Sequence, residues 1–211
     1  FPPTRRSEAW RRAHGIDPDA VVVAFVSRLV WEKGLGVYAD VIRRLERQNV
    51  PHHSLVVGDG PARSALQARL PNATFTGFLE GDALAHAYAS SDVFLFPSDT
   101  ETFGNVTLEA MASGLPTVCA DAAGSRDLVA DGTTGRLCPP EDAGAFADAT
   151  RTLVTDHDRR RRMAAAARER AQDFTWTNVL RRMHQYYGEV LGAPTRPGSP
   201  SSSFPPTNTA A

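Results

Sequence analysis

The chain alternates between short apolar runs and longer segments whose apolar residues recur at helical spacing. The first run, 21–26, contains only Val, Ala and Phe, as expected of a strand that is covered on both faces of a sheet. The following segment, 36–48, places Val41, Ile42 and Leu45 on one helical face. Together these segments predict a β-strand followed by an α-helix.

The same alternation continues along most of the chain. Further strands are predicted at 55–57, 73–75, 93–96, 117–120 and 135–137. Further helices are predicted at 62–70, 82–89 and 106–112. Strands that are joined by helices imply right-handed crossovers and a parallel sheet with helices on both faces. The predicted fold class is therefore α/β, a doubly wound parallel sheet in which ligands bind at the carboxyl ends of the strands.

The two ends of the chain differ from this pattern. Residues 5–14 predict a helix, and we assign 1–14 to a lead-in segment. Three more helices are predicted after the last strand, at 142–155, 158–172 and 176–191. Beyond residue 191 large apolar residues are too scarce to offset the entropy of ordering. We therefore predict a folded domain over 15–191 and a disordered tail over 192–211.

Composition excludes several classes of protein. The net charge of -1, from 23 basic and 24 acidic residues, argues against nucleic acid as a partner, because such binding needs an excess of cations. No apolar run approaches the roughly 20 residues that span a bilayer. The first residues lack the apolar core of a secretory signal, so we expect a cytoplasmic protein. Cys119 and Cys138 lack metal-ligand spacing, and we expect both to be buried, reduced thiols.

The segment that follows the predicted strand 93–96 carries two carboxylates around the start of a helix. Glu101 lies where the strand ends, Gly104 lets the backbone approach a ligand, and Glu109 lies more than one turn into the helix. Carboxylates accept hydrogen bonds from sugar hydroxyls, and the free N–H groups of a helix start favour anionic or hydroxyl-rich ligands. Two arbitrary glutamates could equally be a helix cap and a solvated side chain.

Two cations flank the bend between the first strand and the first helix. Arg28 can form paired hydrogen bonds to a phosphate, and Lys33 supplies a point charge, so together they could neutralise a diphosphate. Taken alone, they could equally be ordinary surface cations. The turn Gly58-Asp59-Gly60 is similar to a dinucleotide-binding loop, but Arg63 stands where the third glycine is required. This argues against a dehydrogenase.

Glu101, seven intervening residues and Glu109 closely resemble the EX7E signature of the GT-B retaining glycosyltransferases, among which family 4 fits best. The resemblance covers about 1–191 and implies the Rossmann-like C-terminal half of such an enzyme. It implies that Glu101 contacts the donor sugar and that Glu109 accepts hydrogen bonds from the ribose. The implied donor-binding set further contains Gly58, Phe78, Leu79, Phe103, Gly104, Asn105 and Thr107.

The resemblance also implies a reaction. Arg28, Lys33 and Glu101 become the expected catalytic residues, and the first two bind the diphosphate. The implied reaction is retaining transfer of a hexose from a UDP- or GDP-sugar to an acceptor hydroxyl, without a metal ion or other cofactor. It requires the cationic bend and the EX7E segment to converge on one pocket.

An acceptor lipid or glycan would be bound by an N-terminal domain that this chain lacks, so we expect the chain alone to bind nucleotide but to transfer sugar poorly. The basic stretch 159–162 could contact a membrane peripherally or form a solvated helical face. The loop 123–127 departs from the Gly-Gly-x-x-Glu pattern of the family, which weakens the sugar contact expected there. A GT-B-like nucleotide-sugar epimerase and a non-catalytic nucleotide-binding module remain alternatives.

Overall fold

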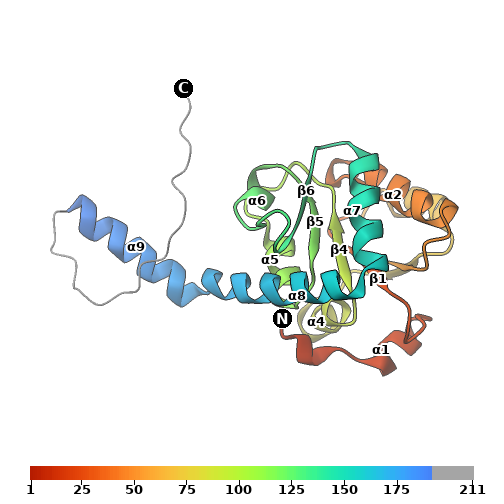
Figure 1. Ribbon diagram of the computed structural model, residues 1–211, viewed down its shortest axis with the longest axis horizontal. Coiled ribbons are helices and arrows are strands. Elements are labelled where there is room, and N and C mark those ends of the chain that lie inside the picture. Colours follow the sequence, from red (N-terminus) through yellow and green to blue (C-terminus); the bar gives the residue numbers. More distant parts are fainter. Residues whose placement is uncertain (192–211) are drawn as a thin grey trace. The chain divides into compact units, whose positions relative to one another are not determined.

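The computed structural model describes residues 1–191, and the predicted tail, 192–211, lies outside the described residues. At its centre is a parallel sheet (Figure 1). The sheet has six strands in the order β3-β2-β1-β4-β5-β6. The strands are β1 (Val22–Val26), β2 (His53–Val57), β3 (Thr74–Gly77), β4 (Val93–Phe96), β5 (Thr117–Ala120) and β6 (Gly135–Cys138). This architecture confirms the predicted doubly wound, Rossmann-like fold class.

The direction of strand order reverses next to β1. This strand pairs with β2 on one side and with β4 on the other. In open α/β sheets such a reversal leaves a crevice at the carboxyl ends of the two central strands. The loops that follow β1 and β4 therefore define the place where a ligand is expected.

Helices cover the sheet and explain why its strands are continuous apolar runs. The helices are α1 (Glu8–Ala13), α2 (Leu35–Arg47), α3 (Arg63–Arg69), α4 (Gly81–Ala89), α5 (Asn105–Ala112), α6 (Ala123–Arg126), α7 (Ala143–Thr155), α8 (His157–Ala171) and α9 (Trp176–Val190). Short 3-10 helices are η1 (Pro3–Arg5), η2 (Trp31–Lys33) and η3 (Gln172–Phe174). Helix α2 packs against α7, and α5 packs against α8. All residues of β1, β4 and β5 are buried, and so are the unpaired thiols of Cys119 and Cys138, as predicted.

The helix predicted over 5–14 is wrong in its first part. The chain forms η1, becomes extended at Arg6 with ψ 128°, and starts again as α1 at Glu8. Ser7 causes the restart because its side chain accepts a hydrogen bond from the N–H of Trp10 at 3.1 Å, which is an N-cap. Helix α1 then anchors the segment through the buried Arg11, whose guanidinium lies 2.6 Å from the carboxylate of Asp92.

The chain divides into two compact units, of which the first is Phe1–Gln172 and the second begins at Asp173. The first unit thus includes the lead-in and ends before residue 191, where we predicted the domain boundary. In the second unit, α9 exposes large apolar side chains, among them Trp176, Tyr187 and Val190. No helix among residues 1–191 combines the length and apolarity of a bilayer-spanning segment.

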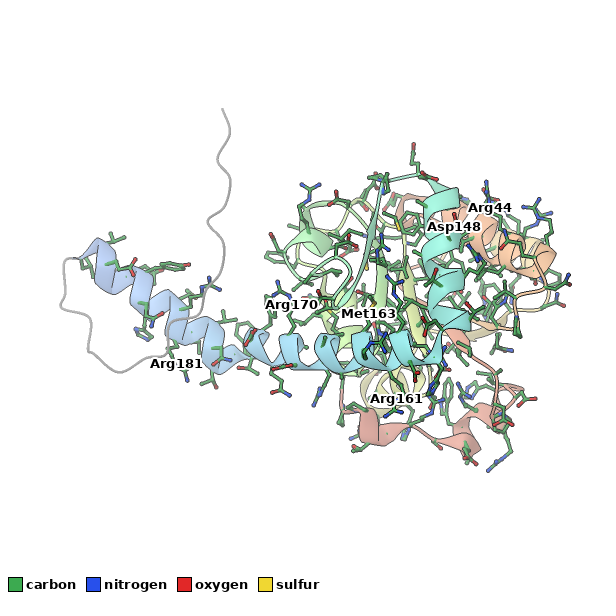
Figure 2. All side chains as sticks on the ribbon, viewed as in Figure 1. Arg44, Asp148, Arg161, Met163, Arg170 and Arg181 are labelled. Atoms are coloured by element: carbon green, nitrogen blue, oxygen red, sulfur yellow. The ribbon has the colours of Figure 1, made fainter. Side chains whose placement is uncertain are left out.

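The basic stretch 159–162 lies on α8 and is only partly a solvated face. Met163 is buried, whereas Arg161 on the same helix is exposed (Figure 2). Arg160, by contrast, donates hydrogen bonds to the carbonyls of Leu153 and Val154 at 2.7 and 3.0 Å. It therefore caps the C-terminal end of α7, where a cation is favourable.

Candidate functional site

The loops after β1 and β4 meet at the carboxyl edge of the sheet. Lys33 in the first loop places its Nζ 2.6 Å from Oε1 of Glu101 in the second. The hydroxyl of Thr100 donates to the carbonyl of Glu32 at 3.3 Å and adds a second link. Only 14% of the Lys33 side chain and 19% of the Glu101 side chain are exposed. The expected convergence of the cationic bend and the EX7E segment is confirmed.

A glycine permits this close approach. Gly34 has a φ of +72°, and a Cβ at this position would lie 2.7 Å from the carbonyl carbon of Pro97. Any other residue would be strained in its backbone and would clash with the β4 loop. Lys33 can reach Glu101 because the backbones of the two loops are in direct contact beside it.

Gly104 lies close to the segment that follows β5. It has a φ of +67° at the start of α5, and a Cβ there would lie 2.7 Å from the carbonyl oxygen of Gly124. The N–H of Gly124 in turn donates to the carbonyl of Glu101 at 3.0 Å. Gly104 therefore allows close packing against α6. The loop 123–127, although it departs from the family pattern, holds the backbone of Glu101.

A cavity of about 190 Å³ opens next to these loops. Its lining residues come from five segments of the chain. Five of these residues were predicted from the sequence to belong to the site: Arg28, Gly58, Phe78, Leu79 and Glu109. The remaining lining is largely apolar. A concave, mainly apolar pocket with a few polar groups is the usual form of a small-molecule site.

Glu109 lines this cavity, and its carboxylate accepts a hydrogen bond from a tyrosine. The hydroxyl of Tyr88, in α4, donates to Oε2 of Glu109 at 3.1 Å. Burial raises the pKa of the Glu109 carboxyl, and the hydrogen bond from Tyr88 lowers this pKa in part. The pKa of Tyr88 is raised by its own burial and by the nearby carboxylate, so the phenol keeps its proton and acts as the donor.

Other predicted residues lie outside the cavity. Thr107 is a correction: its side chain is fully buried, and its hydroxyl lies 3.8 Å from Sγ of Cys119, so it cannot contact a ligand. Phe103 and Asn105 are exposed. Lys33 and Glu101 are absent from the lining of the cavity and form their own pair beside it.

Sequence reasoning missed Tyr88 and overlooked a property of Lys33. Tyr88 lies within an alanine-rich helix and carries no motif that would mark it. Lys33, however, is the only lysine among the 23 basic Lys and Arg residues of the chain. A lone lysine in an arginine-rich chain indicates a position where a compact point charge differs in effect from a guanidinium. Among residues 1–191, His, Cys, Asp and Glu do not gather in groups of three or more that could hold a metal ion.

Known proteins with related sequences include two mannosyltransferases. A GDP-mannose-dependent alpha-mannosyltransferase of Mycolicibacterium smegmatis is 43% identical over 193 residues, which are 91% of this chain and 49% of that protein. A protein of the same name from Corynebacterium glutamicum is 37% identical over 196 residues, 93% of this chain and 46% of that protein. The chain thus spans about half the length of the curated relatives it matches.

Solved structures share the fold. The sucrose-phosphate synthase of Thermosynechococcus elongatus has a TM-score of 0.76 and 26% identity over 92% of this chain and 52% of its own. Anabaena HepE, solved in complex with UDP and glucose, has a TM-score of 0.74 and 25% identity over 90% of this chain and 55% of its own. These likenesses confirm the GT-B architecture. Since the family model for glycosyl transferases group 1 matches residues 6–170, the chain belongs to that family.

Proposed function

We propose that this chain is the donor-binding half of a retaining glycosyltransferase, which transfers a hexose from a GDP- or UDP-sugar to an acceptor hydroxyl. The observation that carries the proposal is the contact between Lys33 and Glu101 at 2.6 Å, because it joins a cationic and an acidic loop at the switch point of the sheet. A nucleotide-sugar needs both kinds of group, cations for its diphosphate and carboxylates for its hydroxyls.

The proposal gives each of these side chains a role that suits its chemistry. Arg28 and Lys33 bind the diphosphate and stabilise the negative charge that develops on it as the bond to the anomeric carbon breaks. Glu101 accepts hydrogen bonds from hydroxyls of the sugar, and Glu109 accepts them from the ribose. Phe78 and Leu79 contact the base from the loop after β3. No metal ion is needed in this scheme, since two cationic side chains take its part.

The relatives guide the choice of donor. Two of them are named for dependence on GDP-mannose, and Anabaena HepE was solved with UDP and glucose. GDP-mannose and UDP-glucose are therefore the first donors to test. We assign the acceptor, a lipid or a glycan, to residues of a longer protein beyond this half, and we expect this chain by itself to transfer sugar poorly.

Isothermal titration calorimetry with GDP-mannose, UDP-glucose and an ADP-sugar tests the proposal. We expect one of the first two to bind with an enthalpy that Glu109→Ala abolishes or strongly reduces. The control is Glu8→Ala, which removes an exposed glutamate of α1 whose ion-pair partner among residues 1–191 is Arg12. If the folded chain, verified by circular dichroism, binds none of these nucleotides, the proposed function is wrong.

A further inference from the structure

Tyr88 contacts Glu109 but is not among the residues that line the cavity. Its side chain is fully buried in α4, and its hydroxyl lies 3.1 Å from Oε2 of Glu109 and 3.3 Å from the carbonyl of Val106. The carbonyl of Val106 lies in the first turn of α5, where it also accepts the helical hydrogen bond from the N–H four residues later. The single phenolic proton therefore favours the carboxylate, which is the nearer and the charged acceptor.

This contact fixes the orientation of a flexible side chain. Aromatic neighbours restrain the Tyr88 ring, with Phe1 packed edge-on at a centroid distance of 5.5 Å and Phe94 at 6.0 Å. Once Oε2 of Glu109 is held by a rigid donor, the position of Oε1 is also set. Within residues 1–191 nothing else forms a hydrogen bond to Oε1, and Glu109 lines the cavity.

The contact also favours the protonation state that recognition requires. A carboxylate can accept hydrogen bonds from ligand hydroxyls at both oxygens, whereas a protonated carboxyl group loses part of this capacity. Burial works against the charged form of Glu109 by raising its pKa, and the Tyr88 hydrogen bond works in the opposite direction. A phenol at this position therefore supports the acceptor form inside a partly buried site.

We propose that Tyr88 is a positioning residue for nucleotide recognition, which holds Oε2 of Glu109 so that Oε1 accepts a hydrogen bond from a ribose hydroxyl. This inference rests on the proposed function, because that function supplies the ribose. It adds a residue to the site that neither touches the ligand nor belongs to the EX7E segment.

The test compares Tyr88→Phe with the unaltered chain in calorimetric titrations of GDP and UDP and of their 2′,3′-dideoxy analogues. The unaltered chain should prefer the ribonucleotide that it binds over the dideoxy analogue. Tyr88→Phe should reduce that preference about fivefold, the effect of one hydrogen bond to a charged group that is lost only indirectly. Affinity for the dideoxy analogue should stay unchanged.

Tyr38→Phe is the matched control. Tyr38 is also fully buried, and its hydroxyl bonds to Oγ of Ser54 at 2.8 Å, away from Glu109. Loss of this hydroxyl should lower the melting temperature but keep the preference for ribose, which separates positioning from a general loss of stability. If the unaltered chain binds a ribonucleotide and Tyr88→Phe keeps the full preference for it over the dideoxy analogue, the positioning role of Tyr88 is overturned while the proposed function stands. If the unaltered chain binds no nucleotide, the proposed function falls, and this inference falls with it.

Discussion

Lys33 Nζ and Glu101 Oε1 lie 2.6 Å apart although the two residues are 68 positions apart in the sequence. Such a partly buried ion pair contributes little net stability, because desolvation of both charges offsets their attraction. Its effect is on position, since it holds an ammonium group at the edge of the sheet. An ammonium has three N–H donors, so Lys33 can contact a phosphate while it stays in contact with Glu101.

The uniqueness of Lys33 gives a direct test of this placement. It is the only lysine of the chain, so an amine-directed acylating reagent modifies one side chain. We expect saturating GDP or UDP to slow acylation of Lys33 about tenfold or more, because a bound diphosphate would cover the ammonium of a side chain that is only 14% exposed. Mass spectrometry of proteolytic fragments measures the rate, and a lysine peptide added to the same solution is the control. Equal rates with and without nucleotide would contradict the placement.

Arg28 should contribute to affinity without contributing to stability. Its side chain is 75% exposed, and its nearest carboxylate, Glu32, lies 4.0 Å away, a weak surface pair. We expect Arg28→Ala to lower affinity for the nucleoside diphosphate about tenfold, since a charge-assisted contact to phosphate is lost. The melting temperature should stay the same.

Arg12→Ala is the matched control for this prediction. Arg12, on α1, forms an exposed ion pair with Glu8 at 3.3 Å, and its partner is four positions away in the sequence, as Glu32 is from Arg28. Calorimetry should show unchanged nucleotide affinity in Arg12→Ala. Equal losses in both variants would mean that the nucleotide responds to overall charge and not to Arg28.

Much of the fold was predictable because burial on both faces of the sheet leaves a local signature. The run 21–26 is apolar at every position, and it became β1. The split between η1 and α1 was missed because Ser7 favours a helix cap only when its neighbours adopt an extended conformation, which depends on tertiary contacts of Arg6 and Arg11. The spacing of apolar residues alone does not predict where the helix is interrupted.

The sequence identified site residues whose side-chain chemistry suits the expected ligand. It missed a residue that acts on another residue of the protein. Arg28, Gly58 and Glu109 all line the cavity, because loops after neighbouring parallel strands meet at one edge. Thr107 lies only two positions before Glu109, yet it is buried toward Cys119, since residues two apart on a helix point to different sides. Tyr88 could not be predicted from the sequence, because its contact with Glu109 depends on how α4 packs against α5.

Gly58 should be among the positions of the site that tolerate substitution least. It has a φ of +132°, and a Cβ there would lie 1.9 Å from the carbonyl oxygen of Ser27. We expect Gly58→Ala to lower the free energy of unfolding by about 2 kcal/mol or more, from backbone strain and the displaced β1 loop. Urea denaturation measures this change. Gly36→Ala, in the first turn of α2 with no atom within 4 Å of the added Cβ, should cause no loss, and equal destabilisation by both changes would contradict the account.

Glu109→Gln should stabilise the chain at neutral pH while it weakens nucleotide binding. Burial raises the pKa of Glu109 in the folded chain, so between the ordinary carboxyl pKa and this raised value the folded state holds more protons than the unfolded state. The free energy of unfolding therefore falls as pH rises through this window, and above it the full cost of the buried charge remains. Glutamine carries no charge, so we expect Glu109→Gln to raise the melting temperature by about 2 °C at pH 8. This gain should disappear as pH falls to about 4, the ordinary carboxyl range.

Scanning calorimetry across this pH range measures the change in melting temperature of Glu109→Gln. The control Glu8→Gln, at an exposed position, should show no such pH-dependent gain. A melting temperature of Glu109→Gln below that of the unaltered chain at pH 8 would show that the ionised carboxylate stabilises the fold, contrary to its burial.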